Sequence, residues 1–175
     1  MGVDPYSFGT AMSEDSSSDR SAAGDGVGMT RDEALAFLAD QGAGVLSLTG
    51  DPPCSLPMSF AVEASTERFV VQVFTGPDSA KAEFLADGVG ASLVAFERST
   101  PDDWASAVAT GELVAVERTP ERVAAFADQA ESVGMEVFDS DPRDLDGAWY
   151  ELRPESVTGR CGPAWSEGNT FGETR

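Results

Sequence analysis

The sequence contains no histidine and only two cysteines, and these shortages exclude much of the chemistry that side chains perform. Without histidine, the chain cannot form a Ser-His-Asp relay, a Cys-His pair or a metal site with imidazole ligands. Cys54 and Cys161 lie far apart and outside any CxxC spacing, so neither a zinc site nor a disulfide framework is indicated. The absence of a GxGxxG or Walker sequence argues against a βαβ nucleotide-binding fold.

Basic residues are also scarce, and long apolar runs are missing. No apolar run approaches the ~20 residues that a membrane-spanning helix needs, and the first residues do not have the pattern of a signal peptide. Thirty-one acidic side chains against eleven basic ones give a formal net charge of −20. This charge opposes binding to nucleic acid or to an anionic membrane, so we expect neither partner. We expect a cytoplasmic protein from a salt-adapted, haloarchaeal source.

The hydrophobic content of 41% supports a folded core, and 175 residues suit a single domain with tails. Residues 1–28 are rich in Ser, Gly and Asp and predict a disordered leader. We expect the folded domain over residues 29–160. Residues 161–175 predict an irregular tail.

Short strands joined by turns dominate the folded part. Thr30 and Glu33 have the spacing of a capping box and predict a helix that Gly42 ends. Thr119-Pro120 predicts the start of a second long helix, which Gly134 ends, and a short helix is expected over residues 79–86. Strands are predicted over residues 45–48, 54–62, 68–74, 89–96, 104–116 and 148–153. This order favours a mainly β fold, an antiparallel β-barrel with peripheral helices.

The segment from Thr75 to Lys81 holds the only lysine of the chain. A strand end, a Gly-Pro turn and a helix start outline an anion site, in which Thr75, Ser79 and Lys81 could bind a phosphate. Asp78 complicates this interpretation, because its carboxylate could cap the same helix and repel the anion. An ordinary strand-turn-helix with a solvated lysine remains the alternative.

Two strands carry further candidate residues. Pro57 cannot donate a ladder hydrogen bond, so it marks a strand edge or bulge where the backbone of Met58 and Ser59 can face a ligand. In the strand from Trp104, alternation places Trp104 and Ser106 on one face and small alanines on the other. A plain edge strand and a strand with one core tryptophan are the respective alternatives.

Together these segments resemble the pyridoxamine 5′-phosphate oxidase-like family of flavin-binding split barrels, over about residues 30–160. The resemblance rests on the helix-strand pair 34–48, on Leu56-Pro57-Met58-Ser59-Phe60, on Ser79-Ala80-Lys81, and on Trp104-Ala105-Ser106-Ala107-Val108 followed by Gly111. In this family an FMN lies at a homodimer interface. The resemblance therefore implies an antiparallel split β-barrel of the FMN-binding type that forms a homodimer.

The resemblance also implies roles for individual residues. The backbone around Pro57, Met58, Ser59 and Phe60 would face the isoalloxazine ring. The phosphate would be held by Thr75, Ser79 and Lys81, while Trp104 and Ser106 would contribute from the fifth strand, to the flavin of the same or the partner subunit. Ala80 stands where the family often carries an arginine, so Lys81 is the only full positive charge in this motif.

The resemblance implies an FMN-binding oxidoreductase that transfers hydride through the flavin, with an unidentified small-molecule substrate or electron donor. The family's true oxidases hold pyridoxal phosphate with basic and histidine residues, and this chain has no histidine. Oxidation of pyridoxamine phosphate is therefore not expected. A deazaflavin cofactor, a non-catalytic flavin-binding or stress-associated module, and a fold whose interface binds nothing remain alternatives. No catalytic residue and no metal ligand is identified.

Overall fold

The computed structural model describes residues 26–63, 65–75, 80–85, 88–131 and 147–168. The strands, in chain order, are β1 (Val27–Met29), β2 (Ala43–Leu48), β3 (Cys54–Glu63), β4 (Arg68–Phe74), β5 (Val89–Arg98), β6 (Trp104–Val116) and β7 (Gly147–Cys161). The helices are α1 (Arg31–Gln41), α2 (Pro120–Gln129) and α3 (Pro163–Gly168), and η1 (Ala80–Glu83) is a single 3₁₀ turn. None of these helices is long and apolar enough to cross a membrane.

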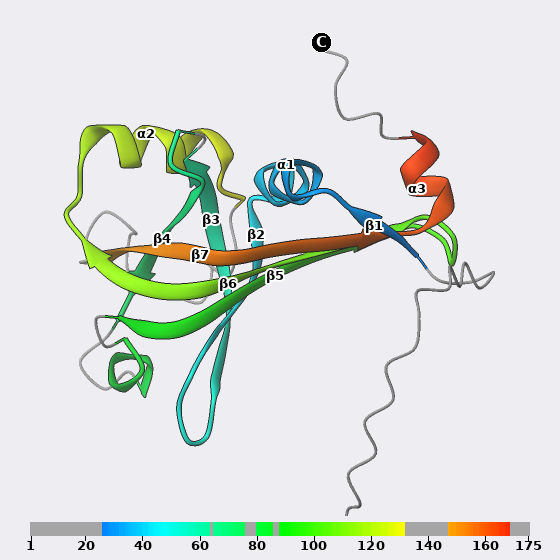
Figure 1. Cartoon of the computed structure of the whole chain (residues 1–175). Coiled ribbons are helices and arrows are strands. Elements are labelled where there is room, and N and C mark those ends of the chain that lie inside the picture. Colours follow the sequence, from blue (N-terminus) through cyan, green and yellow to red (C-terminus); the bar gives the residue numbers. More distant parts are fainter. Residues whose placement is uncertain (1–25, 64, 76–79, 86–87, 132–146, 169–175) are drawn as a thin grey trace, which may run out of the picture.

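The sheet closes on itself as an antiparallel barrel (Figure 1). Its strands follow the order β7-β4-β3-β2-β5-β6, and β6 pairs back to β7 to complete the ring. β1 lies outside the ring and pairs with the end of β7. The fold class predicted from the sequence, a mainly β antiparallel split barrel with peripheral helices, is confirmed.

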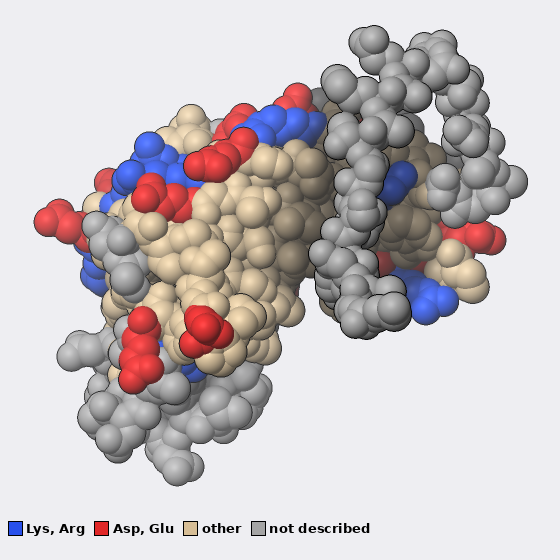
Figure 2. Space-filling view, turned by 60° about the horizontal axis from the view of Figure 1, so that its bottom comes forward, with Lys and Arg blue, Asp and Glu red and all other residues tan. Residues whose placement is uncertain are grey.

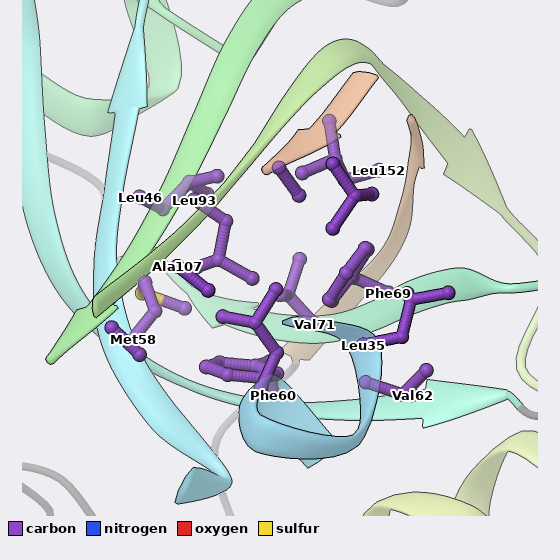
Figure 3. Packing of buried hydrophobic residues seen from close by; sticks show 14 of the residues in the cluster. Leu35, Leu46, Met58, Phe60, Val62, Phe69, Val71, Leu93, Ala107 and Leu152 are labelled. Atoms are coloured by element: carbon purple, nitrogen blue, oxygen red, sulfur yellow. The ribbon is translucent and has the colours of Figure 1, made fainter. Parts of the chain in front are cut away.

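The barrel interior holds the hydrophobic core, as Figure 3 shows. Strand alternation turns one side chain in two inward, and this set includes Leu46, Phe60, Phe69, Leu93 and Leu152, each with 0% of its surface exposed. The predicted small-residue face of β6 also points inward, because its alanines are buried in the same cluster: Ala105, Ala107 and Ala109. α1 adds its own buried side chains to this core: Ala34, Leu35, Phe37 and Leu38.

The predicted capping box forms at the start of α1. The Glu33 N–H donates to the Thr30 hydroxyl at 3.3 Å, and the Thr30 N–H donates to the Glu33 carboxylate at 2.7 Å. The Thr30 N–H and the Thr30 hydroxyl, which donates to the same carboxylate at 2.9 Å, favour its ionised form and lower the pKa of Glu33 below its usual value. Gly42 ends the helix in the left-handed conformation, with φ of 57°.

α2 lies on the outside of the barrel, over β3, β4 and β7 (Figure 1). Phe126 of α2 packs edge-on against Trp149 of β7, with ring centroids 5.5 Å apart. At the end of α2, the Gln129 amide donates to the Val62 carbonyl and accepts from the Val62 N–H, at 3.1 and 2.9 Å. Gln129 thus makes the contacts that a neighbouring strand would otherwise make at that point of β3.

Some predicted boundaries are wrong. The last strand does not end at Arg153 but continues to Cys161, because its polar residues alternate with buried Val157 and Cys161 and pair with β6. α3 then occupies a part of the predicted irregular tail, and β1 begins inside the predicted leader. Of the predicted helix over residues 79–86, the described residues form the single turn η1. α2 ends at Gln129, before the predicted helix end at Gly134. Residues 1–25 and 169–175 lie outside the described residues.

Candidate functional site

Strands β3 and β4 separate part-way along the barrel wall, next to Pro57. β3 pairs with β2 through residues 54–59, but it pairs with β4 only through residues 60–63. The Phe60 N–H donates to the Gly42 carbonyl, on the β2 side, at 2.9 Å. Alternation therefore turns the backbone of Pro57 toward β4. Because proline has no N–H to donate, the ladder between β3 and β4 cannot continue regularly through this residue.

This geometry corrects the predicted exposure of the backbone on β3. Met58 pairs with Gly44 of β2, so its backbone groups lie within a ladder and do not face the gap. The backbone of Ser59 is turned the other way, toward the side from which β4 has departed. The difference arises because successive residues of a strand direct their backbone groups to opposite sides. Pro57 in the sequence indicated an interruption of the ladder between strands. It did not indicate whether the backbone of Met58 or that of Ser59 faces this interruption.

The side chains of the same segment divide between two environments. Met58 and Phe60 point into the core, with 8% and 0% of their surface exposed, and Phe60 packs edge-on against Phe69 with ring centroids 5.9 Å apart. Pro57 is exposed and Ser59 is half-buried on the outer face of the barrel. Only the outer pair can offer side chains to a ligand outside the barrel wall.

The predicted phosphate residues follow the end of β4. Thr75 is exposed directly after the strand, Lys81 is half-buried in η1, and Ser79 lies outside the described residues. The Phe84 N–H donates to the Lys81 carbonyl at 3.0 Å and closes the turn. The Phe84 ring also lies against Gly50, where a Cβ atom would come within 2.7 Å of it, so η1 is held against the β2–β3 turn. One 3₁₀ turn has little dipole, so Lys81 itself is the main source of positive charge here.

Trp104 and Ser106 lie at the other end of the β5–β6 hairpin. Val89 begins β5 shortly after η1, whereas Trp104 pairs with Arg98 at the far end of β5. The nine steps from Val89 to Arg98 span about 30 Å, at ~3.3 Å per residue. A single chain therefore does not bring Trp104 to Lys81. Both side chains face outward, since the alternate residues of β6 are the buried alanines, and so Trp104 is not part of the barrel core.

Between these two ends of the β5–β6 hairpin, the outer surface has a stretch without acidic residues, which we call the acid-free face. It consists of outward positions of five neighbouring strand segments: Ala43, Val45, Ser47, Ser55, Pro57, Ser59, Ser92, Val94, Phe96, Arg98, Trp104, Ser106, Val108, Thr110, Ser156, Thr158 and Arg160. Glu112, which is exposed on β6 and pairs with Gly90, bounds this face at the end of β5 that follows η1. Acidic residues make up 31 of the 175 in the chain, so their absence from these positions is a marked local difference. Seen from below the barrel, the surface shows a broad uncharged area with charged residues mostly at its margins (Figure 2).

The basic residues differ in whether a carboxylate neutralises them. Glu151 is fully buried and accepts from Arg122 and Arg68, with Arg153 at 3.9 Å. Arg31 pairs with Glu67. By contrast, the described part of the chain contains no carboxylate within ion-pair distance of Lys81, Arg98, Arg118 or Arg160. Two of these four residues, Arg98 and Arg160, lie on the acid-free face.

A separate groove of about 560 Å³ lies between α1, β3 and the end of α2. Its floor is apolar, with Leu35, Ala36, Ala39 and Val62, and its rim carries Asp32, Asp40, Glu67 and Gln129. The three carboxylates would repel a phosphate, so this groove does not suit the predicted anion. Within the described ranges, no cluster of three or more His, Cys, Asp or Glu side chains could hold a metal ion.

A family model described as pyridoxamine 5′-phosphate oxidase matches residues 30–161, which is three quarters of the sequence. The chain belongs to the pyridoxamine 5′-phosphate oxidase family. A search of the curated proteins found no match to it. The matched segment contains every residue that the sequence resemblance singled out, from Pro57 to Ser106. The resemblance stated from the sequence is thereby confirmed at the level of the family.

Solved structures with the same fold include flavin-binding proteins. The FAD-binding protein of Mesorhizobium loti has a TM-score of 0.56 and 20% identity, over 77% of this chain and 94% of that one. The FAD-binding protein of Mycobacterium smegmatis has a TM-score of 0.54 and 16% identity, over 77% and 98%. A protein of M. smegmatis that binds FAD and haem has a TM-score of 0.52 and 17% identity, over 78% and 73%. At these identities the likeness establishes the fold.

The sequence missed several residues that the structure makes prominent. Phe96 is 70% exposed on β5, directly across from Ser106 on β6. Arg160 flanks Ser106 from the β7 side, and Arg98 pairs with Trp104. A signal was present in the sequence, because the alternate positions from Trp104 to Thr110 carry no acid in an otherwise acidic chain. This signal could be interpreted only with the knowledge that β7 lies beside β6. In the sequence, α2 and the segment before Gly147 stand between these two strands.

Proposed function

We propose that the protein is a homodimeric flavoprotein oxidoreductase that binds FMN and passes hydride between the flavin and a small, still unidentified substrate or electron donor. The observation that carries this proposal is the position of Lys81. Lys81 is half-buried, and its ammonium has no carboxylate partner among the described residues. Lys81 also follows the strand that borders the gap beside Pro57. A cation in this position suits the phosphate of a flavin nucleotide.

The residues around the gap fit such a cofactor. Lys81 and Thr75 would hold the phosphate, with Ser79 as a further predicted ligand. Pro57 and Ser59 would border the ring, and Met58 and Phe60 would support that segment from the core. When bound, the flavin supplies the hydride chemistry, while the chain positions the ring and excludes water.

The second copy is proposed from the acid-free face. α2 covers the outside of β3 and β4 and contacts β7 through Phe126 and Trp149. The described helices that contact β5 and β6 are α1 and α3, and their buried side chains join the core, on the opposite side of these strands from the acid-free face. This face includes Phe96 at 70% exposure together with half-buried Val45, Val94 and Val108, in a chain with a net charge of −20. Two copies of so acidic a molecule repel each other least where their surfaces carry no acidic residues. Contact between two apolar surfaces also releases the most water.

Face-to-face pairing has a consequence for the site. If the two-fold axis lies in the interface and crosses the strands, the Lys81 end of one copy comes opposite the Trp104 end of the other. Trp104 and Ser106 would then contribute to the partner's flavin, which their separation of about 30 Å from the Lys81 end prevents within one chain.

The choice of cofactor is open to a direct comparison. Neighbours of this fold bind FAD or haem, so FAD and a deazaflavin are tested beside FMN. Haem held by an axial histidine is not available to this chain, which contains none. A non-catalytic flavin module is the alternative function, because no proton-transfer residue is identified near the gap.

The test is a pair of titrations of the purified protein with FMN and with riboflavin, followed by flavin fluorescence. Riboflavin lacks the phosphate, so it reports binding of the ring alone. We expect Lys81→Ala to weaken FMN binding by roughly 10- to 100-fold, the usual effect of losing a charge-assisted hydrogen bond, and to leave riboflavin unchanged. Lys81→Arg should recover much of the affinity, and Arg118→Ala is the matched control. Equal FMN affinity in wild type and Lys81→Ala would sink the phosphate role.

Catalysis is tested separately from binding. The flavin-loaded protein is mixed without oxygen with NADH or NADPH, and the loss of the flavin absorption band is followed. Bleaching at a rate above that of free flavin supports the oxidoreductase. Bound flavin that neither donor reduces favours the non-catalytic module.

A further inference from the structure

The groove between α1, β3 and the end of α2, which we call the acid-rimmed groove, has a volume of about 560 Å³. Sites for small molecules usually measure roughly 300–1,000 Å³. Leu35 of α1 and Val62 of β3 lie side by side at its floor, on the edge of the core (Figure 3). Val62 is five residues beyond Pro57 on β3, or about 16 Å along the strand. The groove is therefore separate from the gap that is proposed for the flavin.

One wall of the acid-rimmed groove is a stripe along α1. Asp32, Ala36, Ala39 and Asp40 are spaced at i, i+4, i+7 and i+8, so they share one face of the helix. Alanine continues the helix but projects only a methyl group, and Ala36 is exposed. A larger apolar side chain at this position would occupy the hollow. The two alanines therefore leave space for a ligand between the acidic ends of the stripe.

The described chain does not fully neutralise the negative charge of the rim. Glu67 is half-buried and pairs with Arg31, with 2.7 Å between the guanidinium and the carboxylate. Asp32 and Asp40 have no basic side chain within ion-pair distance in the described ranges. The rim carboxylates also do not form a group that could hold a metal ion, since none exists among the described residues. An apolar floor with this rim suits an organic cation better than a bare metal ion.

Asp40 is the rim residue whose position is least favourable for the helix itself. It lies in the last turn of α1, which contains no basic residue. The carbonyl end of a helix carries partial negative charge, so a carboxylate there is repelled. Aspartate is also a poorer helix former than alanine. A cation bound beside Asp40 would remove this repulsion and would also interact favourably with the helix end.

We propose that the acid-rimmed groove binds an organic cation with an apolar body, of the arylalkyl amine class. The ammonium group lies beside Asp40, and the apolar body lies over Leu35, Ala39 and Val62. Asp32 is eight residues away on α1, about 12 Å, so a single ammonium group does not reach both aspartates. This inference concerns a second site and does not depend on flavin binding. The bound cation contacts both α1 and β3, so it stabilises the folded chain by mass action.

The first experiment compares three probes by isothermal titration calorimetry of the full chain at physiological salt. Phenylbutylamine has both the charge and the ring, phenylbutanol lacks the charge, and butylamine lacks the ring. We expect phenylbutylamine to bind once per chain, phenylbutanol to bind about threefold to tenfold more weakly, and butylamine about tenfold more weakly. Equal binding of butylamine would show only a general attraction of cations to an acidic chain and would overturn the proposal. Wild-type protein that binds no phenylbutylamine would overturn it as well.

The second experiment fills the groove without changing its charge. Ala36→Leu places a larger apolar side chain in the hollow, and Ala124→Leu makes the same change at an exposed position of α2 that does not line the groove. Leucine is a good helix former, so both variants should fold, and urea unfolding checks this. We expect Ala36→Leu to weaken phenylbutylamine binding at least about tenfold and Ala124→Leu to bind it as wild type does. Unchanged binding in Ala36→Leu refutes the assignment of the site.

The third experiment removes the charge. Asp40→Asn should weaken phenylbutylamine binding about threefold to tenfold without lowering the midpoint of urea unfolding. Asp102→Asn, at the exposed turn between β5 and β6, is the matched control and should bind as wild type does. Equal losses in both variants would reduce the effect to net charge and overturn the role of Asp40. Sedimentation of Ala36→Leu decides about a second copy of the chain, because a lower mass than wild type would show that the copy, and not an amine, occupies the groove.

Discussion

The buried carboxylate of Glu151 and its arginine partners provide a test by protein stability. The expected loss of stability for each variant follows from how exposed the side chains of the ion pair are. Its side chain is 1% exposed, and the side chains of the three arginines near it are exposed to different extents: Arg122 19%, Arg68 38% and Arg153 49%. Arg122 belongs to α2, whereas Arg68 and Arg153 belong to strands of the barrel. The network therefore joins α2 to the outer face of β4 and β7.

Removing one partner of a buried ion pair costs about 3–5 kcal/mol, because the remaining charge stays desolvated. Glu151→Gln leaves all three guanidinium groups without a counter-charge, and Arg122→Gln leaves Glu151 without its best-buried partner. We expect each of these two changes to cost about 3 kcal/mol. Arg68→Gln and Arg153→Gln should each cost ~0–1 kcal/mol, the usual range for exposed pairs.

The assay is urea unfolding at one fixed protein concentration, since dissociation of a dimer would shift the midpoint. Repeating it at low and high salt adds a second criterion, because salt screens exposed pairs more than buried ones. We expect the loss in Arg122→Gln to persist in high salt. The reasoning fails if Arg153→Gln costs as much as Arg122→Gln, or if Glu151→Gln costs less than ~1 kcal/mol.

The remaining predictions concern the junction of α2 and the thiols. Gln129→Leu removes both hydrogen bonds to Val62, so the free energy of unfolding should fall by about 1–3 kcal/mol, measured by urea unfolding. Gly42→Ala should cost ~1–3 kcal/mol or more in the same assay, because φ is 57° and a Cβ would lie 2.1 Å from the Gln129 carbonyl oxygen. Burial raises the pKa of Cys161, so its thiolate forms only at higher pH than usual. Mass spectrometry of alkylation at pH 8 should find Cys54 modified first and the difference lost in urea; equal rates in the folded protein would contradict this.

Most of the barrel could be predicted because its signals are local. The capping box of Thr30 and Glu33, the hairpin turns and the alternating alanines of β6 each depend on residues a few positions apart. The end of β7 was missed for the opposite reason. Its polar second half becomes a strand because β6 and β1 lie beside it, and β1 is more than a hundred residues away in the sequence.

The candidate site was only partly predictable for a similar reason. Pro57 indicated an interruption of the strand ladder because proline has no N–H, and Lys81 was conspicuous as the only lysine of the chain. The distance from Lys81 to Trp104 could not be predicted from the sequence. It depends on which end of β5 follows η1. The exposure of Phe96 and the position of Arg160 beside Ser106 depend on which strands are neighbours, and a short window of sequence does not encode this.

The central claim is that each flavin site takes Lys81 from one copy and Trp104 and Ser106 from the other. It is tested by mixing two defective chains, Lys81→Ala and a chain with Trp104→Leu and Ser106→Ala, then dissociating and reassociating them. Random pairing makes half of the dimers hybrid, and each hybrid holds one intact site and one doubly defective site. FMN titration of the mixture should therefore recover roughly a quarter of the wild-type number of high-affinity sites. Recovery of none, with hybrids confirmed by mass, would contradict a site shared between two chains.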